Sequence, residues 1–384
     1  MHILFEENGY PRIDGWQGGA GTYVKIISSQ LIENGHQVTV VMGEDIDCDS
    51  VSRVDNGIRV FPIKVRSRIL WYISKIPLIN IFFPMLEYLF RGFIKFKLIL
   101  KINKEKKIDI IEYSEGGDFW QSIFKVIPYY CHIHGSGYTL KRHVSKINFS
   151  DKILRAFQCF FISRAKLVIS PSKKMIQLVE KENKNKFKNT ISIKYPVNII
   201  KKDKVLNKIN HPNPIKIFMS ARPDLTKGWI TFLDAIKKVN TNYYKNVFFY
   251  LYGHEQIDPD YEIPNNVLVH PFIDRKRLLN KIEDYHIAVV PSYFDNSPNT
   301  IYEAMSQKIP VIGSNVGGIP ELVIHRKTGL IFKNKSAVAL GNAIIYFINN
   351  PEKIFEMGNN AYKMIFNQCN LKKNYFKRLQ MWNN

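Results

Sequence analysis

The segment from residue 286 to 323 constrains the fold more than any other part of the chain. It reads HIAVVPSYFDNSPNTIYEAMSQKIPVIGSNVGGIPELV, and two short apolar runs, residues 286–291 and 310–314, flank a polar turn and an amphipathic stretch. Short apolar runs bounded by turn residues predict buried strands, and the stretch between them predicts a helix over residues 301–307. Strand, helix and strand in this order predict a βαβ unit of a parallel α/β sheet.

The polar turn of this unit is a candidate ligand site. It leaves the carboxyl end of a strand, where open α/β sheets bind ligands, and it leads into a helix N-terminus, which favours anions. Glu303 lies one turn into the predicted helix. The polar side chains of the turn are Asp295, Asn296, Ser297, Asn299 and Thr300. Together they predict a ligand that has both phosphate and hydroxyl groups.

Length and composition limit the class of protein. With 384 residues, of which 45% are hydrophobic, the chain suits two α/β domains of similar size. Its four cysteines, at positions 48, 131, 159 and 369, show neither a CxxC pair nor metal-ligand spacing, so we expect buried thiols in a reducing compartment. The N-terminus begins as a strand without the regions of a secretory signal, so a cytoplasmic location is expected.

The net charge of +22 is the strongest anomaly of the composition. Nucleic acid, an anionic membrane surface and a nucleotide ligand would each attract such a protein. A lysine-rich composition without any partner is the alternative explanation, and it accounts for a large share of the excess. Nucleic acid explains the charge but not the phosphate-and-hydroxyl pattern of the polar turn, so we do not expect it as a partner.

The N-terminal half opens in a Rossmann-like pattern. Residues 1–5 predict a central parallel strand, and Gly18, Gly19 and Gly21 precede a helix expected over residues 23–34. Glycines at this place permit close approach of the backbone to a ligand. The spacing is not GxGxxG, and no acidic residue closes the next strand, so a dinucleotide cofactor is not expected.

Residues 67–107 mix aromatic, aliphatic and basic side chains. Their longest charge-free run, residues 76–86, contains two prolines and is shorter than the ~20 residues that a spanning helix needs, so a transmembrane segment is not expected. Two interpretations remain. The segment either forms helices that pack on the sheet, or it rests an amphipathic surface on an anionic bilayer.

His134 ends a strand predicted over residues 129–134 and stands before a glycine-rich turn, so we interpret it as a site residue rather than a core histidine. Residues 165–172 predict the last strand of the first half. The second half restarts with a strand over residues 215–221. Arg222 and Lys227 follow this strand, where two cations can bind a diphosphate, and the next helix is expected to begin near Gly228.

These motifs together resemble the retaining GT-B glycosyltransferases of the group 1, or family 4, type. The second half carries ARPDLTKGW, LYG ending at Gly253, VVPS, EAMSQKIPVIGSNVGGIPE and TGLIF, and the first half carries GGAGTYV, ENGHQVTVV, IHG and VISPSKKM. The family pattern has two glutamates separated by seven residues. Here Glu303 takes the second position, and Asp295 stands in the first.

The resemblance implies an α/β GT-B fold with two Rossmann-like domains that face each other across a deep cleft. The expected domains are residues 1–196 on the acceptor side, residues 197–365 for the nucleotide sugar, and a C-terminal helix over residues 366–384 that packs back on the first domain. No cofactor and no metal are implied, because Arg222, Lys227 and helix amides would neutralise the diphosphate. Glu303 would bind the ribose, and Asp295 would bind the sugar.

The same resemblance implies further ligand contacts and partners. The donor-binding residues would include Gly18, Gly19, Gly253 and the polar turn, with His134 beside the acceptor. The donor would be a UDP- or GDP-sugar, and the acceptor a saccharide or lipid-linked saccharide of cell-surface polysaccharide synthesis. If residues 67–107 form the amphipathic surface described above, they would make peripheral contact with the inner face of the cytoplasmic membrane. The alternative is a non-catalytic protein that binds sugars or nucleotide sugars. A nucleotide-sugar epimerase is not expected, because GxGxxG is absent near residue 10.

Overall fold

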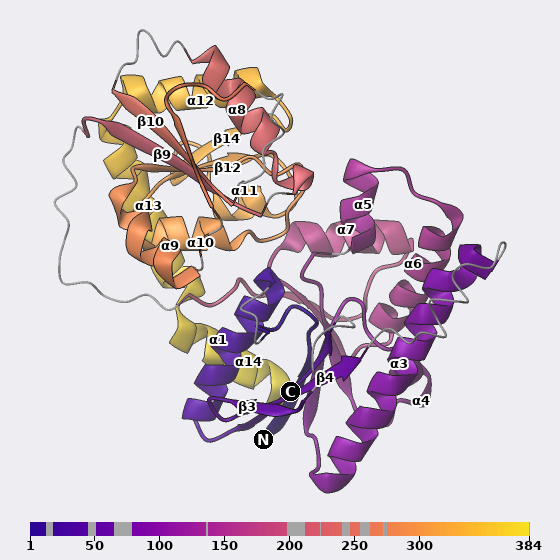
Figure 1. The fold of residues 1–384 in the computed structure, drawn as a ribbon. Helices are drawn as coiled ribbons and strands as arrows, with labels where there is room; N and C mark the ends of the chain where they lie inside the picture. Colours follow the sequence, from indigo (N-terminus) through magenta and orange to yellow (C-terminus); the bar gives the residue numbers. More distant parts are fainter. Residues whose placement is uncertain are drawn as a thin grey trace. The chain divides into compact units, whose positions relative to one another are not determined.

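The chain folds into two compact units. The computed structural model describes residues 1–12, 18–44, 51–64, 79–135, 137–197, 212–222, 224–239, 246–253, 262–271, 273 and 275–383. Unit 1 contains Met1–Pro196 and Leu371–Asn384, and unit 2 contains Val197–Asn370. Figure 1 shows the elements of both units.

Unit 1 is built on an eight-stranded sheet with the order β3-β4-β2-β1-β5-β6-β7-β8. The strands are β1 (His2–Glu6), β2 (Gln37–Glu44), β3 (Arg53–Asp55), β4 (Ile58–Lys64), β5 (Ile110–Ser114), β6 (Tyr129–His132), β7 (Leu167–Ser170) and β8 (Thr190–Ser192). β1 pairs in parallel with β2 and β5, which confirms the predicted central strand. β3 is antiparallel to β4, whereas the other neighbours are parallel.

Helices cover both faces of this sheet, because alternate residues of a strand point to opposite sides. On β1, Phe5 contacts the ring of Trp382 in α14, and the next residue, Glu6, pairs with Lys95 in α3. The helices of unit 1 are α1 (Gly19–Glu33), α3 (Ile79–Glu105), α4 (Phe119–Phe124), α5 (Gly137–Val144), α6 (Phe149–Ser163), α7 (Lys173–Asn183) and α14 (Leu371–Asn383). α1 packs against α14, while α3 packs against α4 and α6 (Figure 1).

Unit 2 has a six-stranded parallel sheet with the order β11-β10-β9-β12-β13-β14. Its strands are β9 (Ile215–Ser220), β10 (Val247–Tyr252), β11 (Val267–His270), β12 (Ile287–Val290), β13 (Val311–Ser314) and β14 (Gly329–Phe332). Its α-helices are α8 (Trp229–Lys238), α9 (Arg275–Lys281), α10 (Asn299–Ser306), α11 (Ile319–Leu322), α12 (Ala337–Asn349) and α13 (Glu352–Cys369), and two 3-10 turns are η1 (Leu225–Lys227) and η2 (Ile282–Asp284).

The core of unit 2 follows from the period of its strands. Ile215, Ile217 and Met219 of β9 share one buried cluster with the apolar faces of α8 and α12. Phe218 points to the opposite face, where its ring lies 4.9 Å from that of Tyr285. Because parallel strands are covered on both faces, they read as continuous apolar runs in the sequence. The predicted α/β class with two parallel-sheet domains is confirmed.

Several predicted boundaries were wrong. The first helix begins at Gly19 rather than residue 23, and the strand predicted as the last of the first half is followed by β8 at the sheet edge. Ser172 caps α7 by accepting a hydrogen bond from the Met175 amide, as its turn predicted. Cys131, Cys159 and Cys369 are buried and form no disulfide among the described residues, and Cys48 lies outside those residues.

Within residues 67–107, the segment expected to contact a membrane or pack on the sheet, residues 67–78 lie outside the described residues, and α3 (Ile79–Glu105) forms most of the remainder. Among the helices that the structure describes, none combines the length and apolar character required to cross a bilayer.

Candidate active site

Each sheet has one topological switch point, and the candidate residues cluster there. In unit 2 the chain proceeds from β9 outward to β10 and β11, then returns to β12 on the other side of β9 and continues to β13 and β14. Unit 1 has the same arrangement at β1 and β5. Loops that leave the carboxyl ends of strands at such a point diverge, which creates a crevice for a ligand. The β9 and β12 loops are therefore the candidate donor site, and the β1 and β5 loops are a second candidate site.

In unit 2, Lys227 and Asp295 join the two loops. Lys227 Nζ lies 2.7 Å from Asp295 Oδ2, and both side chains are partly shielded from solvent, with 25% and 16% exposed. Asp295 Oδ1 also accepts a hydrogen bond of 3.3 Å from the Ser297 amide, so this carboxylate stabilises the turn as well as pairing with the cation. The structure thus brings together two residues that the sequence predicted as site residues from two different motifs.

Backbone contacts fix the same two loops. The Tyr293 amide donates to the Thr226 carbonyl oxygen at 2.7 Å, and the Thr300 hydroxyl donates to the Ser220 carbonyl oxygen at 3.2 Å. Gly228, in a left-handed conformation, is the C-cap of η1 and the N-cap of α8, close to the helix start that the sequence predicted. The position of Lys227 is therefore set by the backbone and not by its flexible side chain alone.

The helix that carries Glu303 starts two residues earlier than predicted. α10 begins at Asn299, so Asn299 and Thr300 belong to its first turn and not to the preceding loop. Their backbone amides are among the first four of the helix, which have no intrahelical acceptor at the preceding turn. Glu303 lies further along α10 and is 5% exposed.

The remaining polar residues of the turn are buried. Asn296 is 2% exposed, and Ser297 is 8% exposed. The Ser297 hydroxyl shares a hydrogen bond of 2.6 Å with the Tyr302 hydroxyl. In this arrangement the Ser297 hydroxyl holds the loop against Tyr302. The sequence had predicted Ser297 as a ligand-binding residue.

Gly317 allows the next loop to approach Asp295. Its φ is +50°, and a Cβ atom at this position would lie 1.9 Å from the Asp295 carbonyl oxygen. The Gly318 amide donates a hydrogen bond of 3.1 Å to the same oxygen. The Gly-Gly turn after β13 therefore packs against the backbone of Asp295 and helps to fix the polar loop of the candidate site.

Arg222 and Gly253 lie at neighbouring strand ends of the same sheet. Arg222 follows β9 with an exposed side chain, for which no hydrogen bond or ion pair is found within the described residues. Gly253 follows β10 and packs against the backbone of residues 221–222. The exposed guanidinium of Arg222 is a cation accessible to an anionic ligand at the carboxyl end of β9.

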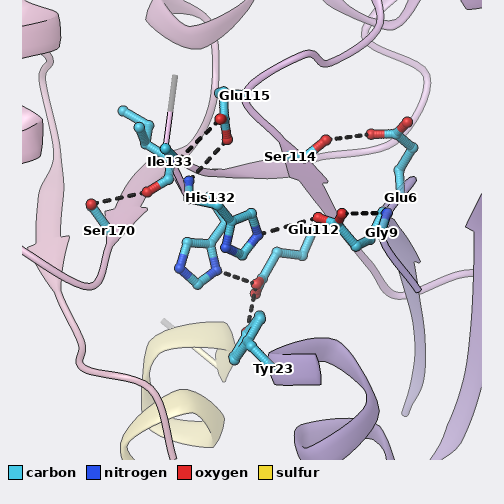
Figure 2. A network of polar contacts seen from close by, with 12 residues as sticks. Glu6, Gly9, Tyr23, Glu112, Ser114, Glu115, His132, Ile133 and Ser170 are labelled. Atoms are coloured by element: carbon cyan, nitrogen blue, oxygen red, sulfur yellow. Dashed lines mark hydrogen bonds and ion pairs between the residues drawn. The ribbon is translucent and has the colours of Figure 1, made fainter. Parts of the chain in front are cut away.

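In unit 1 a buried carboxylate, Glu112 on β5, is the centre of a polar network (Figure 2). It accepts hydrogen bonds from the Tyr23 hydroxyl at 2.7 Å, from His132 Nδ1 at 2.8 Å and from Arg378 Nη1 at 3.4 Å. Burial alone would raise the pKa of Glu112, but the charge of Arg378 and the hydrogen bonds outweigh burial and lower it. Burial lowers the pKa of His132, so a neutral imidazole donates to an ionised carboxylate.

His134 lies at the carboxyl end of β6, stacked on His132 with 4.0 Å between ring centroids. Its side chain is 10% exposed, its Nδ1 shares a hydrogen bond of 2.7 Å with the Tyr195 hydroxyl, and its Nε2 lies 3.5 Å from Glu7 Oε2. Burial lowers the pKa of His134 well below its usual value. Burial raises the pKa of Glu7 to about 8, so this pair is uncharged at neutral pH.

Gly18 and Gly19 lie at the N-terminus of α1 and not in a loop before it, because the helix begins four residues earlier than predicted. Gly18 is the N-cap of α1, its amide donates to the Gly9 carbonyl oxygen at 2.9 Å, and Gly19 is the first helical residue. A Cβ atom on Gly21 would lie 1.6 Å from the Gly9 carbonyl oxygen. At Gly21 the close approach predicted for a ligand is therefore made by the chain's own backbone.

Sequence reasoning missed Glu7, Glu112, Tyr23 and Arg378. Two of these had a usable signal, since Glu7 and Glu112 are acidic residues within or directly after apolar strand runs. A carboxylate at such a place is buried and requires partners. Arg378 gave no such signal, because one arginine in a basic helix looks like a solvated surface residue.

Two family models match the chain. Residues 17–188 match Glycosyltransferase Family 4, and residues 201–364 match Glycosyl transferases group 1. Bacillus subtilis TuaC, named for teichuronic acid biosynthesis, is 31% identical over 99 residues, which are 25% of each chain. A Klebsiella pneumoniae protein of the cps region is 26% identical over 155 residues, 39% of this chain and 42% of that one. The chain thus spans less than half the length of either curated relative.

Solved structures share the fold. Sucrose-phosphate synthase from Thermosynechococcus elongatus has a TM-score of 0.78 at 19% identity, covering 100% of this chain and 98% of that one. HepE from Anabaena, solved in complex with UDP, has a TM-score of 0.68 at 16% identity, covering 100% and 99%. The two family models lie side by side along the sequence, one over each half, and both describe glycosyltransferases. The chain therefore belongs to the group 1 glycosyltransferases.

Proposed function

We propose that the protein is a retaining glycosyltransferase, which moves a sugar from a UDP- or GDP-linked donor to a saccharide or lipid-linked saccharide acceptor. The observation that carries this proposal is the pairing of Lys227 with Asp295 across the switch point of unit 2. A cation that is held by a carboxylate can exchange this partner for the diphosphate of a donor. The same exchange frees the carboxylate to bind sugar hydroxyls.

The leaving group is stabilised by charges fixed in unit 2. Arg222 and Lys227, with the first amides of α10, neutralise the diphosphate as the glycosidic bond breaks. Glu303 accepts hydrogen bonds from the ribose hydroxyls, and the loop around Asn296 and Ser297 shapes the pocket for the sugar. These charges take the place of a metal ion at the diphosphate, so we propose a metal-independent reaction.

Unit 1 is proposed to serve the acceptor. His134, with Gly18 and Gly19, would lie beside the acceptor and the developing oxocarbenium ion. The acceptor hydroxyl attacks the anomeric carbon on the face that the diphosphate leaves, and its proton passes to the departing phosphate oxygen. This route retains the anomeric configuration without a protein nucleophile.

The relatives support this choice of chemistry and pathway. HepE was solved with UDP and with UDP-glucose, and TuaC is named as a glycosyltransferase of teichuronic acid biosynthesis. The Klebsiella relative is named for its place in a cps region. We therefore propose cell-surface polysaccharide synthesis in the cytoplasm, with peripheral contact on the inner face of the cytoplasmic membrane and no nucleic acid partner.

The test is turnover of a panel of nucleotide sugars, first ranked by the thermal shift each one produces. Release of nucleoside diphosphate should fall at least about a hundredfold in Lys227→Ala, because this substitution removes a positive charge that stabilises the diphosphate leaving group. Glu303→Ala should also lose turnover, whereas Lys363→Ala, an exposed lysine on α13, should keep it. Nucleotide release that survives both site variants unchanged would overturn the assignment.

Two further readouts separate the alternatives. The anomeric configuration of the product, read by NMR, tests retention. A donor that raises the melting temperature but is neither hydrolysed nor transferred, with any saccharide acceptor, would instead support a protein that only binds nucleotide sugars.

A further inference from the structure

The outward face of α3 carries one continuous stripe of exposed side chains. The stripe consists of Phe82, Leu86, Phe90, Phe93, Lys97, Lys101 and Lys104. Successive members are three or four positions apart, so they lie on one side of the helix. The stripe changes character along its length, because its first four members are apolar and its last three are lysines. We call it the α3 stripe.

The apolar half of the stripe is unusual for a surface facing water. Phe82, Leu86, Phe90 and Phe93 are 44%, 39%, 42% and 37% exposed. The buried face of the same helix is supplied by other residues, among them Phe96 and Ile99, which are 6% and 0% exposed. The helix therefore has enough apolar side chains to pack on unit 1 without these four. A contiguous exposed apolar patch of this kind marks an interaction surface.

Ring contacts extend the patch across neighbouring helices. The ring centroids of Phe93 and of Trp120 in α4 are 5.3 Å apart, and those of Trp120 and Phe119 are 6.1 Å apart. Phe119 in turn lies 5.8 Å from Phe160 of α6, which is 38% exposed. Phe124 of α4, which is 58% exposed, stacks on Trp120 at 6.3 Å. The exposed rings thus stand on a shared aromatic layer within unit 1.

Cations lie directly over the exposed rings. Lys97 Nζ is 4.5 Å from the Phe93 ring centroid, and the Arg164 guanidinium is 4.7 Å from the Phe160 ring centroid. Aromatic rings beside lysine and arginine suit the boundary between headgroups and acyl chains, where rings insert and cations bind lipid phosphates. The protein as a whole has a net charge of +22, which favours an anionic partner.

We propose that the α3 stripe and the rings of α4 and α6 are the surface by which unit 1 docks on an anionic lipid bilayer. The apolar half, which spans about 16 Å from Phe82 to Phe93, enters the boundary of the acyl chains. The lysine half lies at the level of the phosphates, so the helix meets the membrane at a tilt. This docking gives a residue-level form to the membrane contact included in the proposed function, and vesicle binding can be measured without any sugar transfer.

The experiment is sedimentation of the full-length protein with vesicles of phosphatidylglycerol and phosphatidylcholine, compared with phosphatidylcholine alone. The wild-type protein should bind the anionic vesicles at low salt, and binding should weaken as NaCl rises. Lys97→Glu with Lys101→Glu should lower the partition coefficient at least about 25-fold, since each lysine near an anionic surface contributes about fivefold. Phe82→Ser with Phe90→Ser should lower it at least about tenfold.

Matched controls come from exposed residues elsewhere. Lys372→Glu with Lys377→Glu on α14 changes the net charge equally, and Phe355→Ser on α13 removes an exposed ring. These controls should bind vesicles as the wild type does. Thermal melting checks that each variant is folded, and all of them should keep nucleotide-sugar turnover in the absence of vesicles, because the stripe lies outside the donor site.

Three results would overturn the proposal. The first is a wild-type protein that does not sediment with anionic vesicles at low salt. The second is stripe variants that bind as tightly as the controls. The third is a dimer in size-exclusion chromatography that Phe82→Ser with Phe90→Ser dissociates, because the stripe would then bind a second copy of the chain. Vesicle binding with no nucleotide-sugar turnover would instead refute the proposed activity and leave the docking surface standing.

Discussion

Lys227 and Asp295 are 68 positions apart in the sequence, yet Nζ of one lies 2.7 Å from Oδ2 of the other. The pair holds together the loops that follow β9 and β12. It also sets up a competition, because a diphosphate must displace the carboxylate to reach the ammonium group.

Asp295→Asn should therefore tighten nucleoside diphosphate binding and slow turnover. Removing the carboxylate charge from a partly exposed pair frees Lys227, which should lower the diphosphate Kd about fivefold. Turnover should fall, because the sugar loses its carboxylate partner. Calorimetry of UDP and GDP binding, beside steady-state kinetics, checks both effects.

Asp295→Glu is the matched control, because it keeps the charge and has the residue that the family pattern places there. It should retain the diphosphate affinity of the wild type. If Asp295→Asn binds nucleotide more weakly, the exchange of partners at Lys227 is wrong.

Gly317→Ala should damage both stability and turnover. The added Cβ atom would lie 1.9 Å from the Asp295 carbonyl oxygen at a φ of +50°. The left-handed conformation alone costs about 1–2 kcal/mol for a residue with a side chain, and the clash adds to this cost. Denaturant unfolding and donor turnover measure the two effects.

Gly341→Ala in α12 provides the comparison. Its Cβ atom would meet nothing closer than the Ala235 carbonyl oxygen at 3.4 Å, and alanine is the better helix former by roughly 0.5–1 kcal/mol. This variant should be at least as stable as the wild type. Equal behaviour of the two glycine variants would mean that the Gly317 turn does not support the site.

Arg378→Leu should destabilise unit 1 by about 3–5 kcal/mol, because it leaves the buried Glu112 without its cation. Arg378 is fully buried, and its guanidinium also lies 4.7 Å from the Tyr23 ring centroid. A Trp229→Phe background confines tryptophan fluorescence to unit 1, since the other tryptophans belong to that unit. Urea unfolding in this background isolates the effect.

The neighbouring Lys377→Leu, on the exposed side of α14, should change stability little. Combining Arg378→Leu with Glu112→Gln should recover part of the loss, because the buried charge is then removed. A double variant that is no more stable than Arg378→Leu alone would show that packing, and not the unpaired charge, dominates the effect.

Glu7→Gln should change how stability depends on pH. Burial raises the pKa of Glu7 from 4.5 to about 8 in the folded protein, so the folded state holds a proton that the unfolded state releases. The contribution of this carboxyl is fully present below pH 4.5 and is lost as the pH rises through about 8. The free energy of unfolding of Glu7→Gln, minus that of the wild type, should therefore rise with pH across this window.

The difference in the free energy of unfolding between Glu7→Gln and the wild type should grow by up to about 1.4 kcal/mol per pH unit. Urea unfolding at several pH values in the Trp229→Phe background measures it. A difference that is flat between pH 5 and 8 would mean that Glu7 titrates normally and that its contact with His134 does not hold an uncharged pair.

The sequence predicted β1, β6, β7, β9, β12 and β13 to within two residues at each end, because a parallel strand covered on both faces is a continuous apolar run, whereas β3, β4 and β8 were not predicted. The Asn-Gly dipeptide at residues 56–57 is a further signal in the sequence, and it marks a hairpin. Asn56 and Gly57 both have positive φ and form the turn between β3 and β4, and Asn-Gly flanked by alternating apolar residues is a strong indication of a hairpin.

The contacts between side chains could not be predicted in the same way. The sequence nominated Lys227 and Asp295 separately, because only the order of strands in the sheet makes their loops neighbours. Arg378 and Glu112 are 266 positions apart, and neither shows in the sequence which charge it will meet. A candidate site residue can be recognised from its local sequence. Its contacts with other side chains depend on the topology of the whole unit.

The route of the chain also has a consequence for its synthesis. Unit 2 is one uninterrupted stretch, Val197–Asn370, whereas unit 1 needs Leu371–Asn384 to complete it. A ribosome therefore delivers every residue of the second unit before it delivers the arginine that neutralises Glu112. The usual N-to-C order of domain folding is reversed at the last step, because the first unit to emerge is the last to be finished.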